Sequence, residues 1–275
     1  MKKMLWSCVV ATAVAVMSNP VDGAAQGVHP DDVMQATLRP GWRTESGTHM
    51  AALQIDLDRG WKTYWRRPGI AGIAPRFNWS DSTNLEEVTL HWPRPEVFDQ
   101  SGFSSIGYRR QLILPFEVVP QRDGAPIQID TRVEIGICRE ICIPATLRLQ
   151  AELPAGGAPD SEIQRALDRR PDSPSAAGVG DHACRVTAGA DGALALTASV
   201  SVTHLPGLEA AVLEHADADI RVSHTVMQIN GQRVTATADI ASADGAPLAL
   251  DRDGVRLTLV GGDRAVELHG CPSGG

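Results

Sequence analysis

Positive charge is scarce in this sequence of 275 residues. Lys and Arg together number 25 against 33 Asp and Glu, which gives a formal net charge of −8 at pH 7. Nucleic acids and anionic membrane surfaces select proteins with clustered positive charge. We therefore expect no nucleic-acid partner and no binding to anionic membranes.

Long hydrophobic runs are also absent, apart from one near the N-terminus. The apolar run Met4–Met17 follows Met1-Lys2-Lys3 and precedes the small residues Gly23-Ala24-Ala25. This order is typical of a secretory signal peptide, and the run is shorter than the roughly 20 residues that cross a bilayer. We expect residues 1–25 to be cleaved near Ala24 or Ala25, and the mature chain to be periplasmic with no transmembrane segment.

Two common catalytic motifs are missing as well. The sequence contains no Gly-x-Ser-x-Gly and no His-Glu-x-x-His pattern. A serine nucleophile or a zinc-protease centre is therefore not expected. The sequence predicts no cofactor and no dedicated metal ion.

Helical periodicity is nearly absent from residues 30–154. Apolar and polar residues alternate within 50–57, 127–135 and 147–153, as they do in half-buried strands. The run 112–119 carries Pro115, which predicts an edge strand or a bulge there. These patterns indicate an all-β domain.

The composition changes between residues 155 and 181, where Ala, Gly, Pro, Ser and Asp predominate. We interpret this segment as a linker that contains one short helix, Ser161–Arg170, ended by Pro171. Residues 182–275 then predict a second, smaller β-sandwich-like domain. Its expected strands are 194–202, 221–229, 233–240, 255–260 and 265–268, with hairpin turns at Asn230-Gly231 and Gly261-Gly262.

This second half lacks aromatic residues entirely, because every Trp, Tyr and Phe after Trp6 lies between Trp42 and Phe116. Aromatic side chains bury the largest areas, so a domain without them has a thin core. Cys184 and Cys271 bracket this half, and a disulfide between them would contribute about 4.5 kcal/mol in the chain-entropy treatment. We expect a structural disulfide there, with a second redox or metal pair as the alternative.

Cys138 and Cys142 are separated by only three residues, Arg139-Glu140-Ile141. A bridge across so short a loop contributes only about 2 kcal/mol, which makes it a poor structural staple. An extended chain would hold the two Cα atoms about 13 Å apart, so the backbone must turn between them. A turn at a strand end exposes the bridge and favours reactivity.

Three interpretations of this pair remain open. It is a redox-active exchange site, an inert short-loop disulfide, or a soft-metal site that would need further ligands from elsewhere in the fold. Redox exchange is the interpretation that we favour. Arg139 would favour a neighbouring thiolate, and Glu140 would oppose this effect.

Five segments together resemble the N-terminal periplasmic domain of the thiol:disulfide interchange protein DsbD, and especially its shorter relatives associated with copper stress. The segments are Gly60–Gly69, Pro75–Trp79, Trp92–Pro95, Ile106–Tyr108 and Gly136–Pro144. The resemblance covers roughly residues 30–155, and the second half is similar to the Cys-bracketed β region that follows in such relatives.

The resemblance implies an immunoglobulin-like β-sandwich whose Cys138 and Cys142 pass reducing equivalents between a thioredoxin-fold or membrane thiol–disulfide donor and exported thiol proteins. It implies that Cys142 forms the mixed disulfide with the partner. The sequence departs from the best-known members, which space these cysteines more widely. The channel and the thioredoxin-like domain of longer members are also absent from the sequence given.

The family's cap loop suggests a role for the segment that follows Trp65. The loop Arg66–Ala74, rich in Gly and Pro, would shield the disulfide until a partner displaces it. The residues expected to form the cap are Arg66, Arg67, Pro68, Gly69, Ile70, Ala71 and Gly72. The motif Trp61-x-x-Tyr64-Trp65 is interpreted mainly as core and turn residues, and Tyr108 as a packing residue that could instead bond the cysteines.

Two other functions remain as alternatives to disulfide exchange, and whether the chain is an enzyme is left open. The first is a copper-binding or copper-tolerance module that uses the same two thiols. The second is a non-catalytic interaction protein in which all four cysteines form inert bridges.

Overall fold

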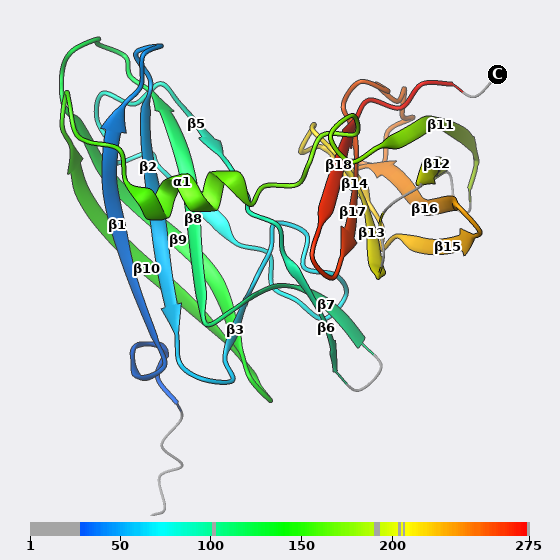
Figure 1. Ribbon diagram of the computed structural model, residues 1–275, viewed down its shortest axis with the longest axis horizontal. Coiled ribbons are helices and arrows are strands. Elements are labelled where there is room, and N and C mark those ends of the chain that lie inside the picture. The colour runs from blue at the N-terminus through cyan, green and yellow to red at the C-terminus, as the bar shows by residue number, and fades with distance from the viewer. Residues whose placement is uncertain (1–27, 101–102, 190–192, 203–204, 206, 274–275) are drawn as a thin grey trace, which may run out of the picture.

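The protein is built from two β domains that lie beside each other (Figure 1). The computed structural model describes residues 28–100, 103–189, 193–202, 205 and 207–273. The predicted signal peptide, residues 1–25, lies outside the described residues. The all-β prediction is confirmed, and each domain consists of two facing sheets.

One sheet of the first domain has four antiparallel strands in the order β1-β2-β8-β5. A single 3₁₀ turn, η1 (Pro30–Asp32), precedes it. The strands are β1 (Met34–Arg43), β2 (His49–Leu57), β5 (Glu87–Leu90) and β8 (Gln111–Val119).

The facing sheet carries the cysteine pair. Its order is β10-β9-β3-β7-β6, and β4 pairs with β9 beside this path. The strands are β3 (Lys62–Tyr64), β4 (Arg76–Asn78), β6 (Glu96–Gln100), β7 (Phe103–Arg109), β9 (Ile127–Cys138) and β10 (Cys142–Leu153).

Alternation along the strands puts one face of each sheet into a shared core. On β9, Val133, Ile135 and Ile137 point inward and are at most 3% exposed. Trp61 and Trp65 join the same cluster, which confirms that both belong to the core. The intervening residues of β9, including Cys138, therefore face outward from the sandwich.

Pro115 lies on β8, which is an interior strand between β2 and β5. β8 keeps a continuous register with β2 from Gln111 to Val118, whereas β5 pairs with it only from Phe116 onward. The predicted edge strand is therefore wrong, and the alternative of a bulge is wrong as well. The Pro115 carbonyl accepts from the His91 N–H at 2.9 Å, and the ladder with β5 ends beside Pro115, which has no N–H to continue it.

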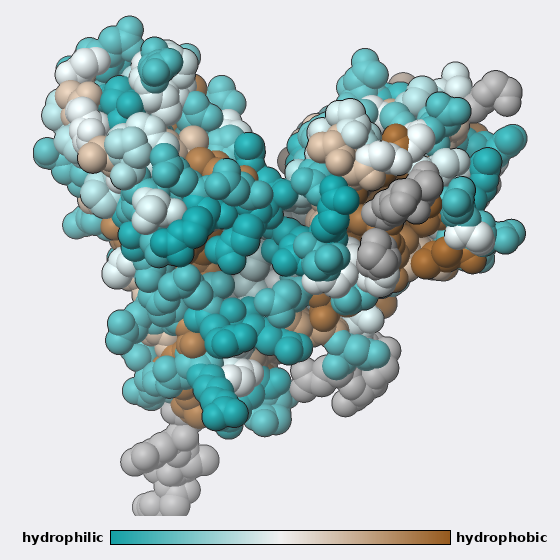
Figure 2. All heavy atoms as spheres, in the orientation of Figure 1, coloured by the Kyte–Doolittle hydropathy of each residue, from teal (hydrophilic) through white to brown (hydrophobic). Residues whose placement is uncertain are grey.

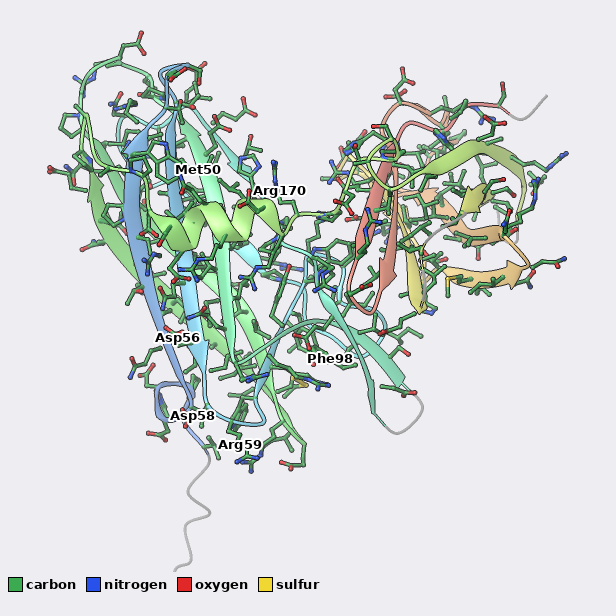
Figure 3. All side chains as sticks on the ribbon, in the orientation of Figure 1. Met50, Asp56, Asp58, Arg59, Phe98 and Arg170 are labelled. Atoms are coloured by element: carbon green, nitrogen blue, oxygen red, sulfur yellow. A yellow bond between two sulfur atoms is a disulfide. The ribbon has the colours of Figure 1, made fainter. Side chains whose placement is uncertain are left out.

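The predicted helix forms as α1 (Ser161–Asp168), two residues shorter than expected at its C-terminal end. Asp160 caps it by accepting from the N–H groups of Glu162 and Ile163. Ile163 and Ala166 are fully buried against the outer face of the β2–β8 sheet, where Met50 lies (Figure 3). Among the described residues, no helix has the length and apolarity needed to cross a membrane.

The second domain pairs a five-stranded sheet with a three-stranded one. The orders are β11-β12-β16-β14, with β15 on β16, and β13-β17-β18. The strands are β11 (Val179–Ala188), β12 (Leu194–Val202), β13 (Leu208–His215), β14 (Ile220–Val222), β15 (Val226–Asn230), β16 (Arg233–Ser242), β17 (Val255–Gly261) and β18 (Ala265–His269). The core between them is made of Ala, Val, Leu and Ile side chains with the two cysteines.

Both predicted hairpins of this domain are confirmed, joining β15 to β16 and β17 to β18. The single strand expected over residues 221–229 is wrong, because the chain breaks into β14 and β15 around Ser223–Thr225. Figure 2 shows the two domains as separate lobes. Apolar atoms are exposed on the second lobe near β15, which carries the exposed Val226 and Ile229.

Candidate functional site

A β-hairpin brings Cys138 and Cys142 together. The two residues are direct partners in the β9–β10 register, with Cα atoms 4.1 Å apart and a disulfide between them. The turn is closed by the Arg139 N–H, which donates to the Ile141 carbonyl at 3.1 Å. The expected turn between the cysteines is therefore present.

The two cysteines differ sharply in exposure. β9 lies between β10 and β3, and Lys62 pairs with Cys138 from the β3 side, so Cys138 is 1% exposed. β10 is the edge strand of the sheet, and Cys142 is exposed at its first residue. An attacking thiolate therefore meets Cys142 first.

The hydroxyl of Tyr64 contacts both sulfur atoms. It donates to the Cys138 Sγ at 2.8 Å and lies 3.2 Å from the Cys142 Sγ. Burial raises the pKa of Tyr64 above 10.0, so the phenol keeps its proton at neutral pH and remains a donor. A thiolate formed at Cys138 would be stabilised by this hydrogen bond.

The sequence interpretation did not single out Tyr64. It grouped this residue with the core tryptophans, yet Tyr64 lies one residue from Trp65 and points to the opposite face of β3. The alternation of side chains along β3 could have identified Tyr64, because alternate residues share a face and Lys62 and Tyr64 lie on the face that carries Cys138.

Tyr108 does not bond the cysteines. It pairs with Thr63, so it faces the core, where its ring stacks on Trp92 with ring centroids 6.4 Å apart. Its hydroxyl donates to the Pro93 carbonyl at 2.8 Å. Tyr108 is therefore a packing residue, which is the interpretation that we favour from the sequence.

Arg139 lies on the hairpin turn with its charge directed to Glu140. Its Nε is 2.8 Å from the Glu140 Oε2, and its guanidinium lies 5.5 Å from the centre of the Trp61 ring. The hydrogen bond from Arg139 holds the pKa of Glu140 below its usual value. Glu140 thus offsets much of the influence that Arg139 was expected to have on a thiol.

Two other cations lie on the face that carries Cys138. Lys62 is the direct cross-strand partner of Cys138, and Arg109 is the partner of Lys62 on the next strand. The Lys62 ammonium and the Arg109 guanidinium lie over the ring of Phe98 on β6, at 5.1 and 4.4 Å from its centre. Figure 3 labels Phe98. Burial and Arg109 lower the pKa of Lys62. The positive charges of Lys62 and Arg109, the cross-strand neighbours of Cys138, favour a thiolate over a thiol at Cys138.

The expected cap loop lies against this site but covers it on one side only. The Ala71 carbonyl accepts a hydrogen bond from the Tyr64 hydroxyl at 3.4 Å. Ile73 rests on Gly136, where an added Cβ would come within 2.7 Å of the Ile73 Cβ. Cys142 stays exposed, so a shield over the whole disulfide is wrong for this conformation.

Cys184 and Cys271 form the second disulfide, far from this hairpin in sequence. The bridge ties β11 to the segment that follows β18, and both residues are at most 5% exposed. Arg252 donates to the carbonyls of both cysteines, at 3.3 and 3.1 Å. The burial of the Cys184–Cys271 disulfide fits the structural role that we expect for it.

Across the described part of the chain, no group of three or more His, Cys, Asp or Glu side chains has an arrangement that could hold a metal ion. The soft-metal interpretation of Cys138 and Cys142 therefore gains no third ligand from these residues.

Comparisons with known proteins agree with this architecture. Residues 29–154 match the family described as the N-terminal part of thiol:disulfide interchange protein DsbD. The crystal structure of the N-terminal periplasmic domain of ScsB from Proteus mirabilis shares the fold, with 21% sequence identity, a TM-score of 0.62, and coverage of 90% of this chain and 97% of that one.

The reduced DsbD N-terminal domain from Neisseria meningitidis is 11% identical, with a TM-score of 0.28 and coverage of 47% of this chain and 91% of that one. No curated protein sequence matches the chain. Through residues 29–154, the chain belongs to the family of DsbD N-terminal domains.

Proposed function

We propose that this protein exchanges its Cys138–Cys142 disulfide with protein partners in the periplasm. The observation that carries the proposal is the asymmetry of the bridge. Cys142 is exposed on an edge strand, whereas Cys138 is buried beside a protonated phenol. A purely structural disulfide needs neither an exposed sulfur atom nor a hydrogen-bond donor such as the Tyr64 hydroxyl.

The geometry assigns different tasks to the two cysteines. A partner thiolate attacks the Cys142 Sγ, the Cys138–Cys142 bond breaks, and the electron pair leaves on the Cys138 Sγ. Tyr64 donates its hydrogen bond to the Cys138 thiolate, and the neighbouring cations Lys62 and Arg109 favour the negative charge of that thiolate. A second partner thiol then attacks the mixed disulfide, so that the partner dithiol is oxidised by two electrons and both cysteines end reduced.

The partners are thioredoxin-fold or membrane thiol–disulfide proteins on one side and exported thiol proteins on the other. The family name supports this class of partner, and the related ScsB domain is described as periplasmic. The signal-like residues 1–25 support the same compartment.

The reduction potential of the Cys138–Cys142 pair tests the proposal. Thiols are trapped across a graded glutathione series, and mass spectrometry identifies which cysteines are modified. We expect a value between about −120 and −270 mV, as in exchange proteins, with Cys184–Cys271 still oxidised. A value below about −300 mV would make the bridge structural and overturn the proposal.

A further inference from the structure

The root of the cap loop is bound to the second domain through Arg66. Its Nε lies 3.1 Å from both carboxylate oxygens of Glu214, and its Nη2 lies 2.8 Å from the Glu214 Oε2. The same Nη2 also pairs with the Glu267 Oε2. Glu214 belongs to β13 and Glu267 to β18, so one guanidinium engages two strands of the other domain.

This cluster is buried, which raises the free-energy cost of separating it. The side chains of Arg66, Glu214 and Glu267 are 17%, 11% and 16% exposed. The Arg66 guanidinium also lies 4.3 Å from the centre of the Trp65 ring. Arg66 holds the pKa of Glu267 below its usual value despite burial, so the carboxylate stays charged. Separating the cluster would leave buried charges without partners.

Arg67 extends the attachment. Its Nη2 donates to the Val222 carbonyl at 3.4 Å, and its Nε lies 3.9 Å from the Glu214 Oε1. Both residues at the start of the loop therefore contact the second domain. The far part of the loop contacts the redox site instead, through Ala71 and Ile73. The loop thus joins the second domain to the disulfide.

Between these attachments the loop has space on one side. A cavity of about 390 Å³ separates Pro68, Gly69 and Ile70 from β13 and from residues 222–227. Ile70 is 67% exposed beside it. Packing on the second domain therefore does not hold the middle of the loop in place. Its support there comes from β7, whose Ile106 N–H donates to the Pro68 carbonyl at 2.9 Å.

We propose that the second domain controls access to the Tyr64 side of the redox site, which the cap loop covers, through Arg66, which acts as a positioning residue. The Arg66–Glu214–Glu267 cluster and the bond from Ile106 to the Pro68 carbonyl together hold the root of the cap loop. Loss of the cluster loosens this root, so that the residues beyond Pro68 shift from Tyr64 toward the cavity. This proposal rests on disulfide exchange at Cys138–Cys142. It gives the second domain a role in setting the rate of that exchange.

The experiment compares the reduction rates of both disulfides in the full chain. Dithiothreitol reduces the oxidised protein, aliquots are alkylated, and mass spectrometry follows each cysteine pair. Arg66→Met should accelerate reduction of Cys138–Cys142 about tenfold, which corresponds to about 1.4 kcal/mol. Glu214→Gln leaves Arg66 paired with Glu267 and should give a smaller acceleration, about threefold. Arg66→Lys should restore part of the wild-type rate.

Arg94→Met is the matched control, because Arg94 donates across the domains to the Gly262 carbonyl at 2.7 Å without joining the loop root. It should leave the rate unchanged. Cys184–Cys271 is the internal reference, and it should remain slow in every variant. If Arg66→Met and Glu214→Gln both reduce at the wild-type rate, the positioning role is overturned.

Two further outcomes also decide between the hypotheses. If Arg66→Met accelerates both disulfides, the second domain has been disrupted, and a wild-type rate in Glu214→Gln then refutes the positioning role. If the wild-type Cys138–Cys142 bridge resists dithiothreitol as strongly as Cys184–Cys271 does, the exchange function fails instead. A phosphine reductant applied to the same variants would then still test the effect of Arg66 on access.

Discussion

The Tyr64 hydroxyl has two partners whose effects on reactivity oppose each other. Its bond to the Cys138 Sγ stabilises a leaving thiolate and speeds exchange, whereas its bond to the Ala71 carbonyl holds the cap loop and slows exchange. A hydrogen bond to a charged group contributes about 1.5–3 kcal/mol, more than a neutral one as long as 3.4 Å. The effect on the thiolate should therefore dominate.

Tyr64→Phe should slow reduction of Cys138–Cys142 by dithiothreitol about tenfold, because the Cys138 thiolate loses its donor. The rate is measured at fixed pH by alkylating aliquots at successive times and determining the fraction of reduced Cys138 and Cys142 by mass spectrometry. Tyr108→Phe is the matched control, since that hydroxyl bonds the Pro93 carbonyl, and its rate should equal that of the wild type. A faster Tyr64→Phe variant would show that the hydroxyl acts mainly through the loop.

His49 makes the stability of the first domain depend on pH. It is fully buried on β2, its Nε2 lies 2.6 Å from the Pro40 carbonyl oxygen, and its Nδ1 has no partner. Burial lowers its pKa below 6.5. The unfolded chain therefore takes up a proton at higher pH than the folded one, and stability falls as the pH drops below about 6.5.

We expect the free energy of unfolding to decrease on going from pH 7 to pH 5, by at most about 1.4 kcal/mol per pH unit for this one group. His49→Gln should flatten that part of the curve in urea titrations followed by tryptophan fluorescence. His91, whose pKa burial also lowers, should account for part of the slope that remains. An unchanged slope in His49→Gln would contradict the assignment.

At the scale of residues, the cysteines were predictable and the phenol was not. A bridge between Cys138 and Cys142 requires a turn between them whatever the fold, so the sequence predicts the turn once the two are taken as a pair. The choice between Tyr64 and Tyr108 depends on the β3–β7 register, which places the two on opposite faces. A shift of one residue in this register would put both tyrosines on the same face, and no local pattern fixes the register.

Among the elements, β9 and the cap loop meet at Gly136, where the absence of a side chain allows Ile73 to approach. Gly136→Ala would put a Cβ 2.7 Å from the Ile73 Cβ, so the loop must move. Reduction of Cys138–Cys142 should accelerate about fivefold, which corresponds to about 1 kcal/mol of overpacking.

The comparison for this variant is Gly180→Ala on β11, where the nearest atom would be the Ser201 Cβ at an ordinary 3.5 Å. That substitution should leave the reduction rate at the wild-type value. If Gly136→Ala is no faster than Gly180→Ala, the loop does not limit access to the disulfide from this side.

The helices and strands that the sequence predicts correctly are those with the strongest sequence patterns. The long alternating runs of β9 and β10 were predicted, and α1 was predicted as a helix that ends before Pro171. The break between β14 and β15 was missed, since Ser223 and Thr225 suit a strand as well as a turn. There the tertiary contact decides, because the Thr225 hydroxyl accepts from the Leu213 N–H.

The whole molecule divides its aromatic residues and its disulfides unequally. All five tryptophans among the described residues lie in the first domain, whereas the second domain has no aromatic side chain and the longer disulfide. Tryptophan fluorescence therefore reports unfolding of the first domain alone, and far-ultraviolet circular dichroism reports both. The two probes together can separate the stabilities of the domains.

Replacing the long bridge should destabilise the second domain selectively. In the chain-entropy treatment, Cys184→Ala/Cys271→Ala loses about 4.5 kcal/mol, against about 2 kcal/mol for Cys138→Ala/Cys142→Ala. A loss of the larger size is comparable to the whole stability of a small domain. Circular dichroism of the first variant should then show a transition at lower temperature that the fluorescence does not follow.

The second variant is the control, because its smaller loss falls on the first domain. Its fluorescence transition should move to lower temperature by several degrees, while the part of the circular dichroism signal that reports the second domain should stay near the wild-type temperature. Because Arg66 joins the domains, early unfolding of the second domain should also release the loop root. The Cys138–Cys142 bridge of Cys184→Ala/Cys271→Ala should therefore become more reducible above the first transition. Coincident transitions by both probes in Cys184→Ala/Cys271→Ala would mean that the two domains unfold as one unit, with the Arg66 cluster and the neighbouring contacts coupling them.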